Sequence, residues 1–302
     1  MDKTKRLIWK AGFYMKKKTN SSTLAKYIMI GPVSLWQYLL VAIPFMYIIG
    51  ISFMNKGTYG GVEKGFTLKN YSDILNSLYI STFAKSLGMS FVVTIVCLVI
   101  AYPFSYFVSE KGPIEKKILM SMVMVPFCVS MIIRIFSWVN ILRADGIINR
   151  LLIKVGIIQE PLKLVYNHTG AMIGLIYMLM PFMILPLYNS MEKFDRSLLE
   201  ASSDLGARPY ITFIKITLPM TKAGIFAGSV MVFIPSMGLY FITDLMGGSK
   251  TLVIGNLIKN QFITARNWPL GAAMSVILMI ITFGMLKGYQ AAGGNMEDLS
   301  GI

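Results

Sequence analysis

The chain has 302 residues, of which 55% are hydrophobic and only 14% are charged, and its mean hydropathy is +0.63. A soluble domain normally carries about 25% charged residues, so this composition excludes an ordinary soluble protein. The net charge of +15 could suggest a nucleic-acid partner. Because much of the excess lies in residues 1–26, we expect this basic cytoplasmic arm to contact anionic membrane lipid, and we expect no nucleic acid as a partner.

Apolar segments of bilayer-crossing length follow the arm. A helix needs about 20 residues to cross the hydrocarbon core, and these segments lack the period-two alternation of barrel strands. The expected fold class is therefore an all-α polytopic membrane protein, with six transmembrane helices in residues 27–290 and a short cytoplasmic tail in residues 291–302. The expected spans are about residues 27–55, 86–108, 118–142, 169–191, 220–246 and 269–289.

The placement of lysine and arginine predicts the orientation of these spans. An even number of spans puts both termini on one side of the membrane, and the larger share of the 29 basic residues falls on that side. Because cytoplasmic loops are enriched in lysine and arginine, both termini of this multi-pass protein are expected to be cytoplasmic. The segment 192–219, between the fourth and fifth spans, is then cytoplasmic as well.

The segment 192–219 is polar for its surroundings and predicts two short amphipathic helices. Apolar residues recur at helical spacing along one face of each. Gly206 suits the left-handed position that ends a helix, and Pro209 suits the first turn of the next one. The residues alone leave two interpretations open: a docking surface for another protein, or a plain connector lying on the membrane surface.

Residues suited to catalysis or metal binding are few. His168 is the only histidine, and both cysteines fall inside expected spans, so neither a catalytic triad, a metal site nor a disulfide is indicated. The GGSKT stretch at 247–251 places serine before lysine, whereas a phosphate-binding loop needs lysine first. We expect no enzyme activity, no nucleotide site and no bound cofactor or metal. A receptor would need a larger soluble domain than the short tail provides.

The segment 192–219 also carries a spaced pattern. Glu200 and Ala201 are followed by Gly206, nine residues separate Gly206 from Ile216, and a Leu-Pro pair ends the pattern at 218–219. This arrangement resembles the loop of permease subunits of bacterial ABC importers, which is written EAA, three residues, G, nine residues, I-x-L-P. Ser202 stands where that pattern has its second alanine, a small-for-small change that should preserve close packing.

The resemblance implies the type I ABC importer permease fold. In that family the loop forms a cytoplasmic coupling helix, which docks into a cleft of a separate ATP-hydrolysing subunit. The residues that the resemblance assigns to this contact are Glu200, Ala201, Asp204, Leu205, Gly206 and Phe213.

Five further segments narrow the resemblance to the B-type permease subunits of bacterial spermidine/putrescine importers. They are residues 66–75, 132–138, 179–202, 236–262 and 267–275. This implies a bacterial cytoplasmic (inner) membrane permease that forms half of a polyamine path and works by alternating access. The implied partners are a second homologous permease, an ATPase dimer that uses ATP and magnesium, and an extracytoplasmic polyamine-binding protein. Sulfate or ferric iron stays open as an alternative substrate, because the coupling loop is shared across importers.

A polyamine is a flexible multiple cation, so its path is expected to offer carboxylates and aromatic faces. Asp244 directly follows the fifth apolar segment, and Tyr240 lies nearly one helical turn before it. We expect this pair to line the external half of the path. The alternatives are that Asp244 marks the membrane surface or pairs with Arg134 or Lys250. Candidates of the same kind are Trp138 and Trp268, which are either walls of the path or belt aromatics at the membrane interface.

Overall fold

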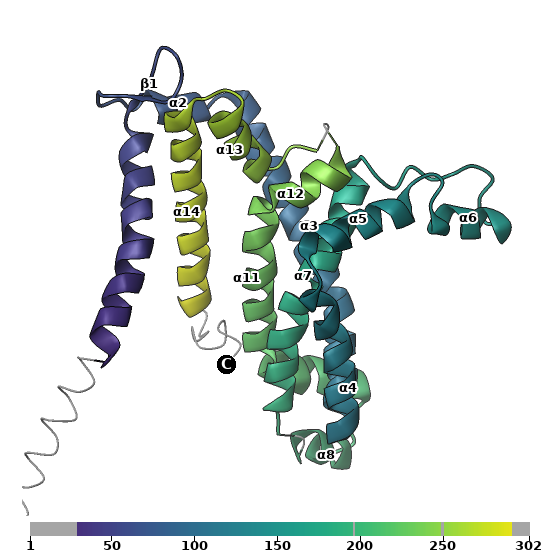
Figure 1. The fold of residues 1–302 in the computed structure, drawn as a ribbon. Coiled ribbons are helices and arrows are strands. Elements are labelled where there is room, and N and C mark those ends of the chain that lie inside the picture. The colour runs from purple at the N-terminus through teal and green to yellow at the C-terminus, as the bar shows by residue number, and fades with distance from the viewer. Residues whose placement is uncertain (1–28, 196, 249–250, 292–302) are drawn as a thin grey trace, which may run out of the picture.

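The computed structural model describes residues 29–195, 197–248 and 251–291, so the basic arm and residues 292–302 of the expected tail lie outside the described residues. Within these ranges the chain is mostly helical, and its long helices run roughly side by side (Figure 1). Four unbroken helices are long and apolar enough to cross a membrane: Met29–Ser52, α3 (Ser77–Ser109), α7 (His168–Glu192) and α14 (Trp268–Ala291). Two bent helix pairs bring the described spans to as many as six, which agrees with the expected fold class.

Most of the shortest elements lie at the two ends of the bundle (Figure 1). A small antiparallel hairpin follows the first helix, and in it Asn55 pairs with Glu63. The remaining elements are β1 (Asn55–Lys56), β2 (Val62–Glu63), α2 (Lys69–Ile74), α4 (Pro113–Met124), η1 (Val125–Cys128), α5 (Met131–Leu142), α6 (Ile147–Lys154), α8 (Ser197–Asp204), α9 (Pro209–Thr212), η2 (Phe213–Thr217), α10 (Leu218–Met220), α11 (Lys222–Gly238), α12 (Tyr240–Ile242), η3 (Thr243–Gly247) and α13 (Ile254–Ile263).

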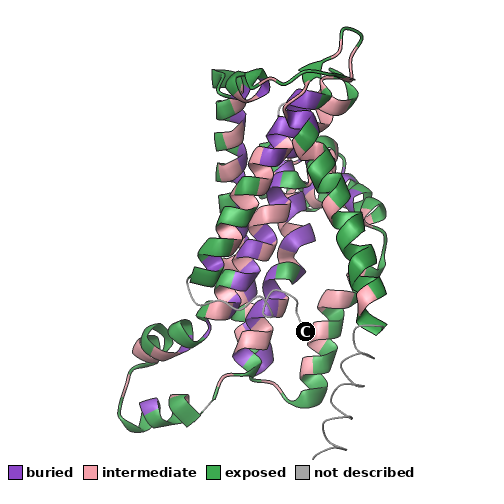
Figure 2. Ribbon diagram, turned by 90° about the vertical axis from the view of Figure 1, so that its left-hand side faces the viewer, coloured by how far each residue is buried: buried purple, intermediate pink, exposed green. Residues whose placement is uncertain are grey.

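The core lies where α3, α7 and α11 pack against one another. Two glycines let α11 approach α7 closely. A Cβ atom on Gly224 would meet the Pro186 carbonyl oxygen at 2.7 Å, and one on Gly228 would meet the Met183 sulfur at 2.7 Å. Small residues are typical of such contacts, because dispersion between closely packed helices replaces the hydrophobic effect inside a membrane. Buried residues accordingly concentrate on the inward faces of these helices (Figure 2).

The expected third span at 118–142 is not one continuous helix. α4 runs into η1, a 3-10 turn, and the segment that contains α5 and α6 leaves it at 97°. The cause is Pro126, at the start of η1, which lacks the N–H that an α-helix needs and clashes with the preceding turn. Val129 then takes an extended conformation and forms the corner. The straight segment is therefore 113–128, which begins earlier than expected.

The expected fifth span at 220–246 is interrupted twice. A bend of 64° at Thr221 separates the segment 209–220 from α11. At the other end α11 stops at Gly238, and Leu239 separates it from α12 and the π-helical η3. α13 packs directly on this second break, since a Cβ atom on Gly255 would meet the Gly238 carbonyl oxygen at 2.6 Å. The carboxylate of Asp244 thus lies on a short separate element and not at the end of a straight span.

We predict that Gly224→Ala destabilises the helix bundle. The added methyl group would overlap the backbone of α7, which no side-chain rotation can relieve, and overpacking of this kind costs about 1–3 kcal/mol. The control is Gly88→Ala on α3, where no atom lies within 4 Å and where alanine favours a helix by about 1 kcal/mol. The apparent melting temperature in detergent should fall for the first variant only. Equal melting of the two variants would contradict this packing.

Candidate functional site

The segment 197–220 folds at one end of the molecule as two helical pieces joined by a tight turn (Figure 1). Gly206 has a φ of +73°, the left-handed conformation that a side chain disfavours. The Gly206 amide donates to the Ser203 carbonyl and the Ala207 amide to the Ser202 carbonyl, which is the hydrogen-bond pattern of a Schellman helix end. Pro209 begins the second piece. This geometry agrees with the two short helices expected from the sequence.

Ser202, the residue that departs from the family pattern, is buried and joins the two pieces. The residue is only 6% exposed, and its hydroxyl forms a hydrogen bond with the Thr212 hydroxyl. A buried hydroxyl without a partner would be costly, so Thr212 compensates for the change from alanine. The departure therefore adds a bond between the two pieces and does not loosen them.

The residues assigned to ATPase contact are exposed in this chain, and Figure 2 shows mostly exposed surface at this end of the molecule. Leu205, at the turn, is 87% exposed. Phe213 differs from the other five, because its ring also packs edge-to-face on Tyr102 of α3, with 5.6 Å between the ring centroids. The Tyr102 hydroxyl in turn hydrogen-bonds the Thr221 hydroxyl at 3.0 Å.

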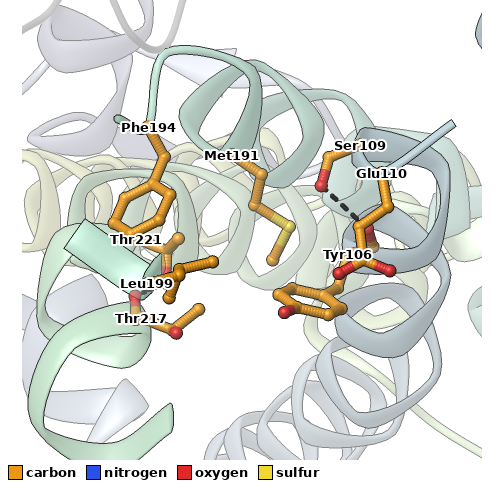
Figure 3. Close-up of a pocket in the computed structure, with 8 residues that line it drawn as sticks. All are labelled: Tyr106, Ser109, Glu110, Met191, Phe194, Leu199, Thr217 and Thr221. Atoms are coloured by element: carbon orange, nitrogen blue, oxygen red, sulfur yellow. Dashed lines mark hydrogen bonds between the residues drawn. The ribbon is translucent and has the colours of Figure 1, made fainter. Parts of the chain in front are cut away.

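A small cavity marks the junction between this segment and the long helices (Figure 3). Its volume is about 20 Å³, room for roughly one water molecule. The lining residues come from α3, α7 and the segment 194–221, and they are Tyr106, Ser109, Glu110, Met191, Phe194, Leu199, Thr217 and Thr221. Nearby, Lys116 of α4 forms an ion pair with Glu192, the last residue of α7, with 2.8 Å between Nζ and Oε2. The segment is thus joined to the bundle by the packing around this cavity and by the contacts of Tyr102 with Phe213 and Thr221, and the Lys116–Glu192 pair links α4 to α7 beside it.

A second group of polar side chains lies at the opposite end of the molecule, where side chains of η3 and α13 contact each other (Figure 1). The Asp244 carboxylate forms an ion pair with the Lys259 ammonium through Oδ2 and accepts a hydrogen bond from the Asn256 amide at Oδ1. The Lys259 Nζ also lies 5.4 Å from the centroid of the Tyr240 ring. Asp244 and Tyr240, paired in the sequence prediction, therefore surround the same ammonium group. We call Tyr240, Asp244, Asn256 and Lys259 the ammonium cluster.

Asn256 fixes the position of the carboxylate. It is 3% exposed, and its Oδ1 accepts hydrogen bonds from the Thr243 hydroxyl at 2.7 Å and from the Val253 amide at 3.3 Å. α13 itself is tied to α3, because the Ile254 amide donates to the Ser86 hydroxyl at 2.9 Å. A buried, fully bonded amide is rigid, so the carboxylate that it orients is pre-positioned. The Lys259 and Asp244 side chains remain partly accessible, at 30% and 35% exposure.

The other candidate residues lie apart from this arrangement. Trp138, on α5, packs against Tyr177 of α7 with ring centroids 5.1 Å apart, and Trp268, at the start of α14, lies 6.4 Å from Phe262. The alternative that Asp244 pairs with Arg134 is wrong, since Lys259 takes that place. Lys250, the other suggested partner, lies outside the described residues.

The Arg134 guanidinium instead lies over the Phe127 ring, with its Cζ 4.3 Å from the ring centroid. Its Nε and Nη1 are buried without a hydrogen-bond partner in the part of the chain that the structure describes. In the same part of the chain, no group of three or more His, Cys, Asp or Glu residues is placed to hold a metal ion.

Sequence reasoning missed Asn256 and Lys259. Their spacing of three residues places them on one face of a helix, which is the signal that was available. The sequence did not indicate that this face would meet Asp244, because the contact depends on how α13 folds back over the end of α11.

Comparison with known proteins identifies the family. The model of the family described as "Binding-protein-dependent transport system inner membrane component" matches residues 98–287. The chain is 42% identical to the spermidine/putrescine transport system permease protein PotB of Escherichia coli (strain K12) over 264 residues, which cover 87% of this chain and 96% of that protein. It is 39% identical to the PotB protein of Haemophilus influenzae over 265 residues, 88% of this chain and 93% of that protein.

Solved structures resemble the fold as a whole. A chain of a bacterial alginate ABC transporter, solved with a pentasaccharide-bound periplasmic protein, aligns with a TM-score of 0.72 at 14% identity, covering 90% of this chain and 94% of that one. A chain of the MetNI methionine ABC transporter aligns with a TM-score of 0.51 at 18% identity, covering 72% and 97%. At such identities the likeness shows the fold alone, that of the type I ABC importer permeases. On the family match and the close relatives together, the chain belongs to the binding-protein-dependent transport system inner membrane components.

Proposed function

We propose that this chain is the permease subunit of an ATP-driven importer of polyamines such as spermidine and putrescine. The strongest support is the 42% identity to a spermidine/putrescine permease over 87% of the chain. The ammonium cluster adds a physical reason, because a carboxylate and an aromatic face already hold a primary ammonium there. The chain forms half of the translocation path, and a second homologous permease forms the other half.

The exposed turn at Leu205 and Gly206 is the proposed contact with an ATPase dimer. In this arrangement the partner ATPase binds and hydrolyses ATP with magnesium, and the present chain holds no nucleotide. The turn then faces the cytoplasm, as do both termini, in the bacterial inner membrane. The ammonium cluster faces the opposite side, where an extracytoplasmic binding protein delivers the polyamine.

α11 connects the two proposed sites. Its first end meets the 64° bend at Thr221 that follows the coupling segment, and its second end stops at Gly238, two residues before Tyr240. The close packing of Gly224 and Gly228 on α7 makes this pair of helices a stiff unit. A displacement of the coupling segment by the ATPase can thus reach the ammonium cluster, as alternating access requires.

Labelled spermidine uptake in the native cell tests the proposal. Deleting the gene should abolish the uptake, and the intact gene should restore it, because the path lacks one half without this chain. The control is uptake of an unrelated amino acid, which should not change. Unaltered spermidine uptake in a deletion strain that has no second polyamine system would refute the polyamine assignment, and sulfate and ferric iron would be tested next.

Asp244→Asn should lower the uptake rate about tenfold, since a hydrogen bond to a charged group is worth about 1.5–3 kcal/mol and 1.4 kcal/mol corresponds to a factor of ten. The asparagine keeps the size of the side chain and removes its charge. Asp145→Asn is the matched control, because Asp145 forms only a surface ion pair with Arg143 and its side chain is 69% exposed. Uptake should be compared at equal amounts of assembled importer. Equal uptake rates for the two variants would show that the Asp244 carboxylate does not contact the substrate.

Substitutions of Gly206 should uncouple ATP hydrolysis from uptake in the order asparagine, alanine, valine, with valine most severe. No atom lies within 4 Å of a Cβ at Gly206, so the effect comes from the backbone conformation and not from a clash. A left-handed conformation costs an ordinary residue roughly 1–2 kcal/mol, whereas asparagine tolerates it. Uptake per ATP hydrolysed, measured in proteoliposomes, is the readout.

Gly112→Ala is the matched control for this series. Gly112 also has open space around its Cβ position, but its φ of −68° suits any residue. Normal coupling in Gly206→Val, with Gly112→Ala also normal, would show that the shape of the turn is not needed.

A further inference from the structure

Lys259 places a primary ammonium on an alkyl chain against Asp244 and Tyr240. An end of a polyamine presents the same chemistry, a primary ammonium on an aliphatic chain. We propose that the Lys259 ammonium occupies the substrate's own cation site while the path is empty, and that an incoming polyamine ammonium displaces it from Asp244. This inference rests on the proposed function and adds to it a residue that regulates the site.

The two sides of the ion pair differ in mobility. Asp244 is oriented by Asn256, which is buried and itself bonded to Thr243 and Val253. Lys259 ends in a compact charge on a flexible four-carbon stem and is 30% exposed. Water can therefore reach the ammonium, and the stem can swing away without disturbing α13. The carboxylate is the fixed partner and the ammonium is the exchangeable one.

The Lys259 ammonium stabilises the site while no substrate is bound. The Asp244 side chain is only 35% exposed, and a partly buried carboxylate without a charged partner is costly, so Lys259 neutralises it until substrate arrives. After the exchange, the displaced ammonium stays tethered close to the bound polyamine and repels it. Transport needs a site that is favourable enough to enter and weak enough to leave, and a tethered competitor provides this balance.

The competing interpretation is an ion pair that only holds α13 against η3. The two interpretations predict opposite effects of removing the ammonium. A structural ion pair would leave polyamine binding unchanged or weaker after its loss. A displaceable occupant would leave binding tighter, because the site is then always open to the substrate.

Equilibrium binding of labelled spermidine to the purified, assembled importer, without its binding protein, separates these outcomes. Lys259→Met keeps an unbranched side chain and should bind spermidine about fivefold more tightly than the wild type, a factor in the range of partly exposed ion pairs. Lys259→Arg keeps a cation and should show no gain. The double variant Asp244→Asn with Lys259→Met should lose the gain, because the acceptor is then absent.

Lys154→Met, on the exposed face of α6, controls for the loss of one positive charge and should bind as the wild type does. If Lys259→Met forms an assembled importer that binds spermidine equally or less tightly than the wild type, the inference is overturned. Uptake by the wild-type importer tests the proposed function separately. Intact uptake without tighter binding by Lys259→Met would therefore refute the displacement alone.

A measurement on the wild-type importer needs no variant. Lys259 should react faster with an amine-acylating reagent when spermidine is saturating, because displacement releases its ammonium from Asp244. The fractional labelling of Lys259 can be read by mass spectrometry, with Lys154 as the internal reference. Unchanged or slower labelling of Lys259 in the presence of spermidine would contradict the displacement.

Discussion

The close approach of α11 to α7 is the contact on which the rest of the structure depends. A Cβ atom on Gly224 would overlap the α7 backbone, and one on Gly228 would crowd the side chain and carbonyl oxygen of Met183, so the backbone of α11 lies directly on α7. Inside a membrane, where apolar surfaces gain nothing from leaving the lipid, such packing is a main source of helix association. It gives the molecule one stiff pair of helices, around which more irregular elements can be arranged.

α11 is broken off from its neighbouring elements at both of its ends, and these two breaks carry the proposed functions. At one end the chain bends at Thr221 into the exposed coupling segment; at the other it stops at Gly238 and places Asp244 on a short π-helical element. Irregular backbone within a membrane protein needs other partners for its polar groups. Here the Asn256 amide donates to the Tyr240 carbonyl beside the break and to the Asp244 carboxylate, while the Ser86 hydroxyl accepts from the Ile254 amide at the start of α13. The side chain of Asn256 thus both satisfies a backbone carbonyl beside the break and orients the carboxylate of the ammonium cluster.

The sequence predicted the features that local chemistry decides. Apolar runs predicted the spans, and the spacing around Gly206 predicted a turn whose left-handed conformation the structure contains. Proline was less informative: α11 continues through Pro235, whereas a helix ends at Pro126 in a 97° corner, so the residue type alone did not decide where a helix breaks. The pairing of Asp244 with Lys259 was not predictable for a similar reason. It joins residues on separate elements, and only the close packing of α13 on the end of α11 brings them together.

The most direct test is a structure of the whole importer, with its second permease and ATPase subunits, trapped while a polyamine is inside the path. The quantity to measure is the distance from the nearest polyamine nitrogen to the Asp244 carboxylate. We expect about 2.7–2.9 Å, the length of a charge-assisted hydrogen bond, with the Lys259 ammonium moved away. A polyamine bound elsewhere in the path, with Lys259 still paired to Asp244, would contradict the assignment of this cluster as the cation site.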